Sequence, residues 1–181
     1  MPVRRFPLAT HGRIMTPDKS SATVISNQQL AGLSGKALDS TRRRANLNVH
    51  PELADPVQRM FNAMEPDTYV RPHRHARDNG WELMMVIAGR FGILLFDDTG
   101  RVTDRFDLAE DAVRAVEIPP HAWHAVVSLE PGTVMFEVKQ GPYAPLADKD
   151  FAPWAPVEDH PASQRMRDWY AVARVGEMPP E

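Results

Sequence analysis

Residues 81–106 read WELMMVIAGRFGILLFDDTGRVTDRF, and this stretch decides the fold class. Two apolar runs, 81–88 and 90–97, are followed by a third extended run over 101–106. The Asp-Thr-Gly turn before the third run is typical of a β-hairpin. Short apolar runs bounded by turn residues are typical of strands, and they are too short for ordinary helices. The stretch therefore predicts consecutive antiparallel strands.

The same pattern of short apolar runs separated by turn residues continues on both sides of this stretch. Turn residues separate further short runs, for example at Asp78-Asn79-Gly80 and Pro119-Pro120. They predict additional strands at 57–64, 68–75, 114–118, 123–129 and 133–139. Proline is excluded from helix interiors, so 17 prolines against 10 glycines exclude an all-helical bundle. About eight strands with no helices between them favour a double-sheet roll or small barrel.

Helical patterns flank the strands. Ser26 and Gln29 form a capping-box pattern, and the apolar residues that follow at helical spacing predict a helix over about 27–40. A second helical pattern covers about 162–174. The predicted organisation, in chain order, is an irregular arm over 1–22, a helix packing on the barrel within 23–45, the barrel over 46–160 and a C-terminal helical tail over 161–181.

The composition excludes several classes of protein. A net charge of −3 provides no field that would attract nucleic acid or an anionic membrane, and we interpret Arg42-Arg43-Arg44 as a solvated face. The absence of cysteine excludes disulfides and thiolate chemistry, and it suits a cytoplasmic protein. The longest apolar stretch, 83–88, is too short to span a bilayer. The N-terminus lacks the apolar segment of a signal peptide.

Three histidines and one glutamate stand at informative positions. His73 and His75 are two residues apart in an extended segment, so their side chains project to the same side. Glu82 and His124 each stand at the head of an apolar run. Taken singly, these features also fit a surface histidine pair, a strand-edge carboxylate and a structural histidine. Together, three imidazoles and one carboxylate suit one divalent transition metal (Fe, Zn, Ni or Mn) with positions left open for water or substrate.

The order of these residues resembles the two motifs of the cupin superfamily. The first motif is Gly, five residues, His-x-His, three or four residues, Glu, six residues and Gly. Here Asp67 takes the first glycine position and six residues separate His75 from Glu82, while Gly89 closes the motif as expected. The resemblance implies a double-stranded β-helix, that is, a jelly-roll barrel with one metal in its mouth.

The second motif, Pro-x-Gly-x-x-His with Asn four residues later, corresponds to Pro119 through His124, with Ser128 at the Asn position. His121 replaces the turn glycine, which predicts strain from a positive φ. His121 also offers a spare imidazole that could exchange with His124 as a ligand.

Within the superfamily the chain more closely resembles the WbuC-type cupin metalloproteins. The segments that carry this likeness lie within about residues 24–160 and include EPDTYVRPHRH at 65–75, EIPPHAWH at 117–124 and DKDFAPWAP at 148–156. That family takes its name from bacterial polysaccharide gene clusters, so the resemblance hints at a sugar or sugar-derived acid as substrate.

Residues near the predicted metal offer further chemistry. If the strand over 68–75 alternates regularly, Tyr69 and Arg71 face inward with the histidines. Arg71 then binds a carboxylate or phosphate, or it forms an internal salt bridge. Tyr69 or His121 could move a proton. Glu137 and Lys139 share one face of the last strand and are either residues of the barrel mouth or outward solubilising groups.

Two classes of function follow. The first is a metal-dependent isomerase, lyase or dioxygenase acting on a small polar or anionic substrate, with the metal as Lewis acid. The second is a non-catalytic domain that binds or senses a small ligand. Exposed sheet edges further predict a homodimer, in which the N-terminal arm and helix cover an edge.

Overall fold

In the computed structural model, residues 22–180 are described, so all but Ala22 of the predicted N-terminal arm lies outside them. The chain forms eight strands flanked by two helices. These are α1 (Asn27–Asp39), β1 (Arg44–Asn48), β2 (Val57–Met64), β3 (Glu82–Ala88), β4 (Arg90–Phe96), β5 (Val102–Ala109), β6 (Ala115–Ile118), β7 (Trp123–Ser128), β8 (Thr133–Gln140), a 3-10 turn at Asp148–Asp150 and α2 (Ala162–Val172).

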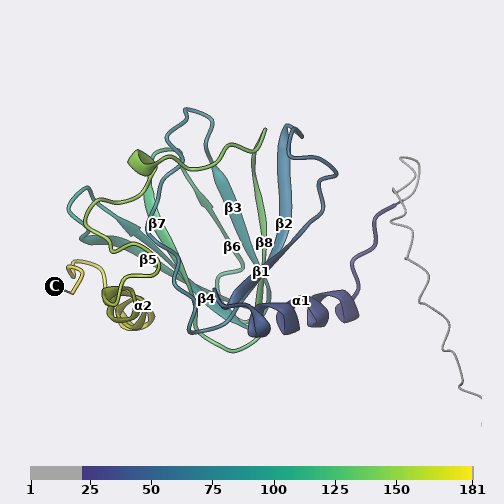
Figure 1. The fold of residues 1–181 in the computed structure, drawn as a ribbon, viewed down its shortest axis with the longest axis horizontal. Helices are drawn as coiled ribbons and strands as arrows, with labels where there is room; N and C mark the ends of the chain where they lie inside the picture. Colours follow the sequence, from purple (N-terminus) through teal and green to yellow (C-terminus); the bar gives the residue numbers. More distant parts are fainter. Residues whose placement is uncertain (1–21, 181) are drawn as a thin grey trace, which may run out of the picture.

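The strands make two antiparallel sheets that face each other (Figure 1). One sheet has the order β1-β2-β8-β3-β6 and the other β5-β4-β7. The chain passes repeatedly from one sheet to the other, since β3, β6 and β8 belong to the first sheet while β4, β5 and β7 belong to the second. This connectivity is that of a jelly roll. It confirms the predicted all-β jelly-roll fold with an N-terminal and a short C-terminal helix.

Two details differ from the sequence prediction. The strand β1 was not predicted, although Ala45 and Leu47 alternate there with polar residues. Conversely, the segment 68–75 is not a regular strand, and it pairs only through isolated bridges at His73. The proline at position 72 cannot donate a backbone hydrogen bond, which limits pairing within this segment.

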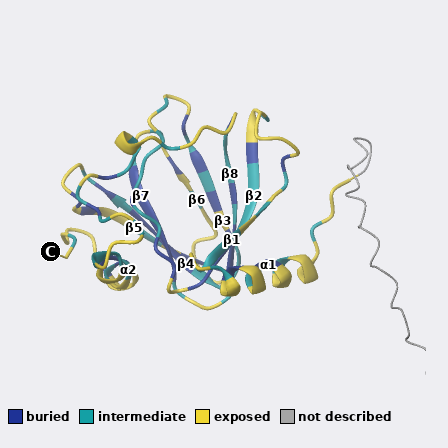
Figure 2. Cartoon of the chain, in the orientation of Figure 1, coloured by how far each residue is buried: buried dark blue, intermediate teal, exposed yellow. Residues whose placement is uncertain are grey.

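Each helix packs against part of one sheet and exposes its other side (Figure 2). The predicted capping box is confirmed at the start of α1, where the Ser26 Oγ accepts from the backbone N–H of Gln29. Leu33 and Ala37 of α1 pack against Ala63 and Val134 of the five-stranded sheet. The glycines in α1 lower its intrinsic helix stability, so this packing is what holds the helix in place.

The helix α2 packs on β4 and β7 and is tied to the edge strand β5 by a single arginine. The Arg105 Nη1 donates to the carbonyls of Tyr170 at 2.7 Å and Ala173 at 3.0 Å, and its Nη2 donates to that of Ala171 at 3.1 Å. These are carbonyls of the last turn, which have no partner within the helix. Beyond the helix, Val102 exchanges two backbone hydrogen bonds with the C-terminal segment, through Gly176 and Glu177. The tail therefore continues the pairing of β5.

Gly100 closes the β4–β5 hairpin with a φ of +91°, and a Cβ there would lie 2.8 Å from the Trp154 ring. We expect Gly100→Ala to lower the free energy of unfolding by more than the ~1–2 kcal/mol that a left-handed backbone costs an L-residue. Gly132→Ala is the matched control, because Gly132 has a φ of +70° but open space around it. Urea denaturation of both variants measures the difference, and equal losses would contradict the ring contact.

Candidate metal centre

Four side chains from three separate parts of the chain converge between the two sheets. His73 and His75 come from the irregular segment beside β7, Glu82 begins β3, and His124 lies in β7. One ligating atom from each lies within 4.8 Å of all the others. His73 and His124 form an isolated β-bridge, in which the backbone N–H of each donates to the carbonyl of the other, at 3.0 and 2.9 Å. This bridge fixes the two backbone segments against each other. The structure thus brings together the whole predicted ligand set.

The histidines are oriented for metal binding by their own backbones. The Nδ1–H of His73 donates to the Arg71 carbonyl and that of His124 to the Ala122 carbonyl, each at 3.0 Å. A neutral imidazole that donates from Nδ1 has its lone pair on Nε2. This second hydrogen bond is the usual way in which proteins orient a ligating histidine.

Three of the four ligating atoms have no other partner among the described residues. The Nε2 atoms of His75 and His124 lie 3.3 and 3.2 Å from the Glu82 Oε2. All three atoms are buried and have no hydrogen-bond partner among the described residues. Buried polar atoms left without a partner are costly, so three of them facing one another indicate a cation between them. Atoms bonded to one metal at about 2.1 Å lie about 3 Å apart when adjacent, which fits these distances. The residues present therefore fit a mixed nitrogen and oxygen site for a divalent transition metal.

The charges of the site favour the ligating forms. Burial, and then the neighbouring His124, lowers the pKa of His73 to about 3, so this ring is neutral at pH 7. Burial acts to raise the pKa of Glu82, but Lys139, followed by His124 and His75, holds it well below the ordinary value. A neutral imidazole and an ionised carboxylate are the forms that bind metal, so no proton must leave either group first.

A cavity of about 260 Å³ opens from this cluster along the inner face of the five-stranded sheet. Glu137 and Lys139 line it, so they are residues of the cavity wall and not outward solubilising groups. The Lys139 Nζ lies 2.6 Å from the Glu137 Oε1 and 3.4 Å from the Glu82 Oε1, while the Asn62 Nδ2 donates to the Glu137 Oε2 at 2.7 Å. Burial, and then Glu82, raises the pKa of Glu137 to about 8.

Two arginines of the basic run also line the cavity. Arg42 pairs with both carboxylate oxygens of Glu158, at 2.8 and 2.7 Å, and Arg44 pairs with the same carboxylate at 2.8 Å. The interpretation of this run as a solvated face therefore holds for Arg42, whose side chain is 60% exposed, but not for Arg44, which is 21% exposed. Sequence reasoning missed both as residues of the site.

Tyr69 and Arg71 are not brought to the cavity. The Tyr69 hydroxyl donates to the Pro156 carbonyl, and its ring stacks on Tyr170 of α2. Arg71 donates to the Ala152 carbonyl, and its guanidinium lies over the Phe151 ring. Val70 faces the cavity instead. The expected alternation fails here because 68–75 is not a regular strand, and a catalytic role for either residue stays an untested prediction.

His121 lies apart from the ligand cluster at the turn before β7. Its φ of +66° confirms the predicted left-handed backbone. Its Nε2 lies 3.3 Å from a carboxylate oxygen of Asp78, and the side chain is 51% exposed. In this structure the fourth nitrogen or oxygen donor of the set therefore belongs to His124 and not to His121.

We expect His121→Gly to leave the metal content unchanged and to alter the free energy of unfolding by less than about 1 kcal/mol, because relief of the left-handed backbone offsets the flexibility of glycine. His121→Val should destabilise the protein clearly, since branched side chains are poorly tolerated at positive φ. Thermal unfolding and metal analysis of both variants test this. Loss of metal in His121→Gly would show that His121 is a ligand.

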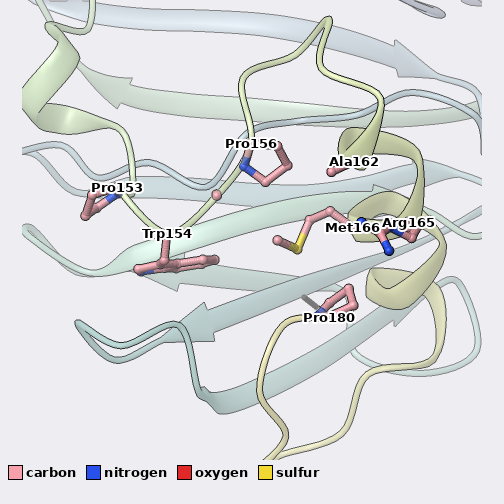
Figure 3. A pocket seen from close by; sticks show the side chains of 8 residues that line it. Pro153, Trp154, Pro156, Ala162, Arg165, Met166 and Pro180 are labelled. Carbon is pink, nitrogen blue, oxygen red and sulfur yellow. The ribbon is translucent and has the colours of Figure 1, made fainter.

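A second pocket, of about 350 Å³, lies beside α2 (Figure 3). Its lining is mostly proline, alanine and other apolar groups, with Arg165 as the charged side chain. Its lining contains none of the four candidate metal ligands. The helices found in residues 22–180 lack the length and apolar composition of a membrane-spanning segment.

Comparisons with known proteins give the following findings. A family model described as "Domain of unknown function (DUF6016)" matches residues 25–108. A search of curated proteins found no match. Among solved structures, the chain is similar to KdgF from Halomonas sp. (20% identity, TM-score 0.44), oxalate decarboxylase from Bacillus subtilis (17%, 0.44) and a cupin superfamily protein from Desulfitobacterium hafniense (16%, 0.43). These matches cover 56%, 59% and 54% of this chain and 82%, 26% and 76% of the other chains, respectively.

Proposed function

We propose that this protein is a mononuclear divalent-metal cupin of the WbuC type and an enzyme that acts on a small polar or anionic substrate, such as a sugar-derived acid. The observation that carries the proposal is the cluster of His73, His75, Glu82 and His124, whose unpartnered buried atoms face one another beside a cavity. Structural metal sites tend to be closed, whereas a site that opens into a cavity suits substrate binding.

When bound, the metal supplies Lewis acidity, which polarises a substrate oxygen. The chain's own residues divide the remaining tasks. His73 and His124 hold their rings in place through Nδ1, and Lys139 fixes the Glu82 carboxylate from its other oxygen. The pair Glu137 and Lys139 stands in the cavity wall next to Glu82, where a carboxyl with a pKa of about 8 can give or take a proton near neutral pH. Isomerase, lyase and dioxygenase reactions are all compatible with such groups.

The test begins with the purified protein and its metal content. We expect one divalent transition metal per chain, removal by a chelator and restoration by Mn²⁺, Fe²⁺, Ni²⁺ or Zn²⁺. The reloaded protein is then incubated with a panel of hydroxy acids, sugar acids and diols, and NMR and oxygen uptake report turnover. Activity that is lost with the metal and regained with it supports the proposal. A protein that retains no metal contradicts it, and a loaded protein that binds members of the panel without converting them is a binding domain and not an enzyme.

Three further predictions rest on the sequence alone. They are the homodimer, the cytoplasmic location and the association with bacterial polysaccharide metabolism. Light scattering tests the first, and a monomeric mass would contradict it.

A further inference from the structure

We propose that Arg42 and Arg44 form an anion-binding subsite in the metal cavity, so that the ligand is a small acid carrying a second anionic group, a carboxylate or a phosphate, at its far end. The inference rests on the proposed function, because it assigns the other half of the same site. It names a ligand class that the metal cluster alone does not specify.

The strand register places the two halves of the site at opposite ends of the sheet. Glu82 pairs with Lys139 near the end of β8, whereas Arg44 pairs with Met64, which pairs with Thr133 at the start of β8. The Arg44 side chain reaches back toward the metal ligands, because its Nη1 donates to the carbonyl of Tyr69, four residues before His73, and four extended residues span roughly 13 Å. Both ends line one cavity, so a ligand reaching from one to the other must be elongated.

Arg44 is held in place while part of its guanidinium remains available. Its Nη1 lies 2.8 Å from the Glu158 carboxylate and donates to the Thr68 hydroxyl at 3.2 Å and the Tyr69 carbonyl at 2.9 Å. Within residues 22–180, the hydrogen bonds of this guanidinium to Thr68 and Tyr69 and its 2.8 Å contact with Glu158 run through Nη1. Arginine offers a planar fork of donors, so Nη2 and Nε can still bind a carboxylate or phosphate.

The charges of the cavity also favour an acid with two anionic groups. Three cationic side chains (Arg42, Arg44 and Lys139) stand against three carboxylates, namely Glu82 and Glu137 in the lining and Glu158 behind the arginines. With Glu137 ionised these charges balance, and with Glu137 protonated one positive charge is in excess, so a bound divalent ion would leave at least two positive charges uncompensated. Charges in a partly buried site attract a compensating ligand more strongly than they would in water.

The middle of the cavity has a different character. Its walls between the two charged ends are formed by Met64, Met84, Met135, Val70 and Val126, with Asn46 and Asn62 as polar groups. A cavity of about 260 Å³ is smaller than the ~300–1,000 Å³ typical of drug-sized ligands. The ligand is therefore a small metabolite with its charges at the two ends and an uncharged middle.

The experiment uses the zinc-loaded full-length protein and three acids that share one metal-binding hydroxy-acid end. Gluconate has no second anionic group, glucarate has a distal carboxylate, and 6-phosphogluconate has a distal phosphate. Isothermal titration calorimetry should show at least ~10-fold tighter binding of one or both of the latter two, since a hydrogen-bonded charge pair contributes about 1.5–3 kcal/mol. If glucarate binds more tightly, the subsite prefers a carboxylate, and if 6-phosphogluconate binds more tightly, it prefers a phosphate.

The variants separate this proposal from general effects. Arg44→Met should remove the preference while the zinc content and the affinity for gluconate stay the same. Arg42→Met is the second variant, because the exposed Arg42 can be replaced with little risk to folding. Arg114→Met, at an exposed position outside the cavity lining, is the matched control and should keep the preference.

Three results would each contradict the subsite. The first is equal affinity of the zinc-loaded protein for the three acids, and the second is binding of none of them. The third is a preference for an acid with a second anionic group that persists in both Arg42→Met and Arg44→Met. A protein that holds no zinc after dialysis instead refutes the proposed function, and the subsite falls with it. Metal analysis of each sample before titration distinguishes these failures.

Discussion

His75→Ala should reduce the metal content of the purified protein by at least ~10-fold. His75 contributes one of the four ligating atoms, and its Nε2 is buried 3.3 Å from the Glu82 Oε2 with no hydrogen-bond partner among the described residues. Replacement of His75 removes one of the four metal–ligand bonds, so the remaining three ligands bind the ion more weakly. Inductively coupled plasma mass spectrometry on protein dialysed against metal-free buffer measures the change.

His160→Ala is the matched control for this variant. His160 is exposed and its Nδ1 accepts a hydrogen bond from the backbone N–H of Ala162 at the start of α2, far from the ligand set in the chain. We expect it to keep one metal per chain. An unchanged metal content in His75→Ala would refute its assignment as a ligand, provided that circular dichroism shows the variant to be folded.

Phe91→Ala should cost about 3–5 kcal/mol in the free energy of unfolding, the range for removing a large aromatic side chain from a packed core. Phe91 is 0% exposed and lies on β4 among Met84, Ile93, Leu108 and Val126, the cluster that forms the apolar support of the cavity. The loss combines the transfer of apolar surface to water with the cavity left behind. Urea denaturation of the wild-type and variant proteins measures it.

Phe91→Leu provides the comparison, because it retains most of the apolar volume and should cost clearly less. A loss below about 1 kcal/mol in Phe91→Ala would show that the two sheets do not close tightly around this side chain. At a temperature where Phe91→Ala remains folded, its metal content should match that of the wild-type protein, since Phe91 contributes no ligand.

The sequence was sufficient to predict the parts of the site that are encoded locally. His73 and His75 are neighbours in the chain, and Glu82 and His124 were conspicuous because each stands at the head of an apolar run. The strands β2 to β8 and both helices were predicted close to their observed ends, because turn residues and a capping box mark these boundaries.

The sequence was insufficient where long-range contacts decide the placement. Arg42 meets Glu158 across 116 residues of chain, and no local pattern reveals that contact. The placement of Tyr69 depends on how 68–75 runs beside β7, where pairing is confined to His73 and the alternation of a regular strand does not apply. Glu137 and Lys139 could be assigned to one face of a strand from their spacing, but only the sheet order shows that this face lines the cavity.

The C-terminal segment has a consequence for how copies of this chain behave at high concentration. A bare edge strand offers unpaired N–H and C=O groups on which another polypeptide can nucleate intermolecular β-structure. At Val102 these groups are already taken by Gly176 and Glu177, and Arg105 fastens the preceding helix alongside. The C-terminal segment thereby blocks this point of the β5 edge against pairing with another chain. Affinity tags or fusion partners should therefore be placed where they do not displace this segment from β5.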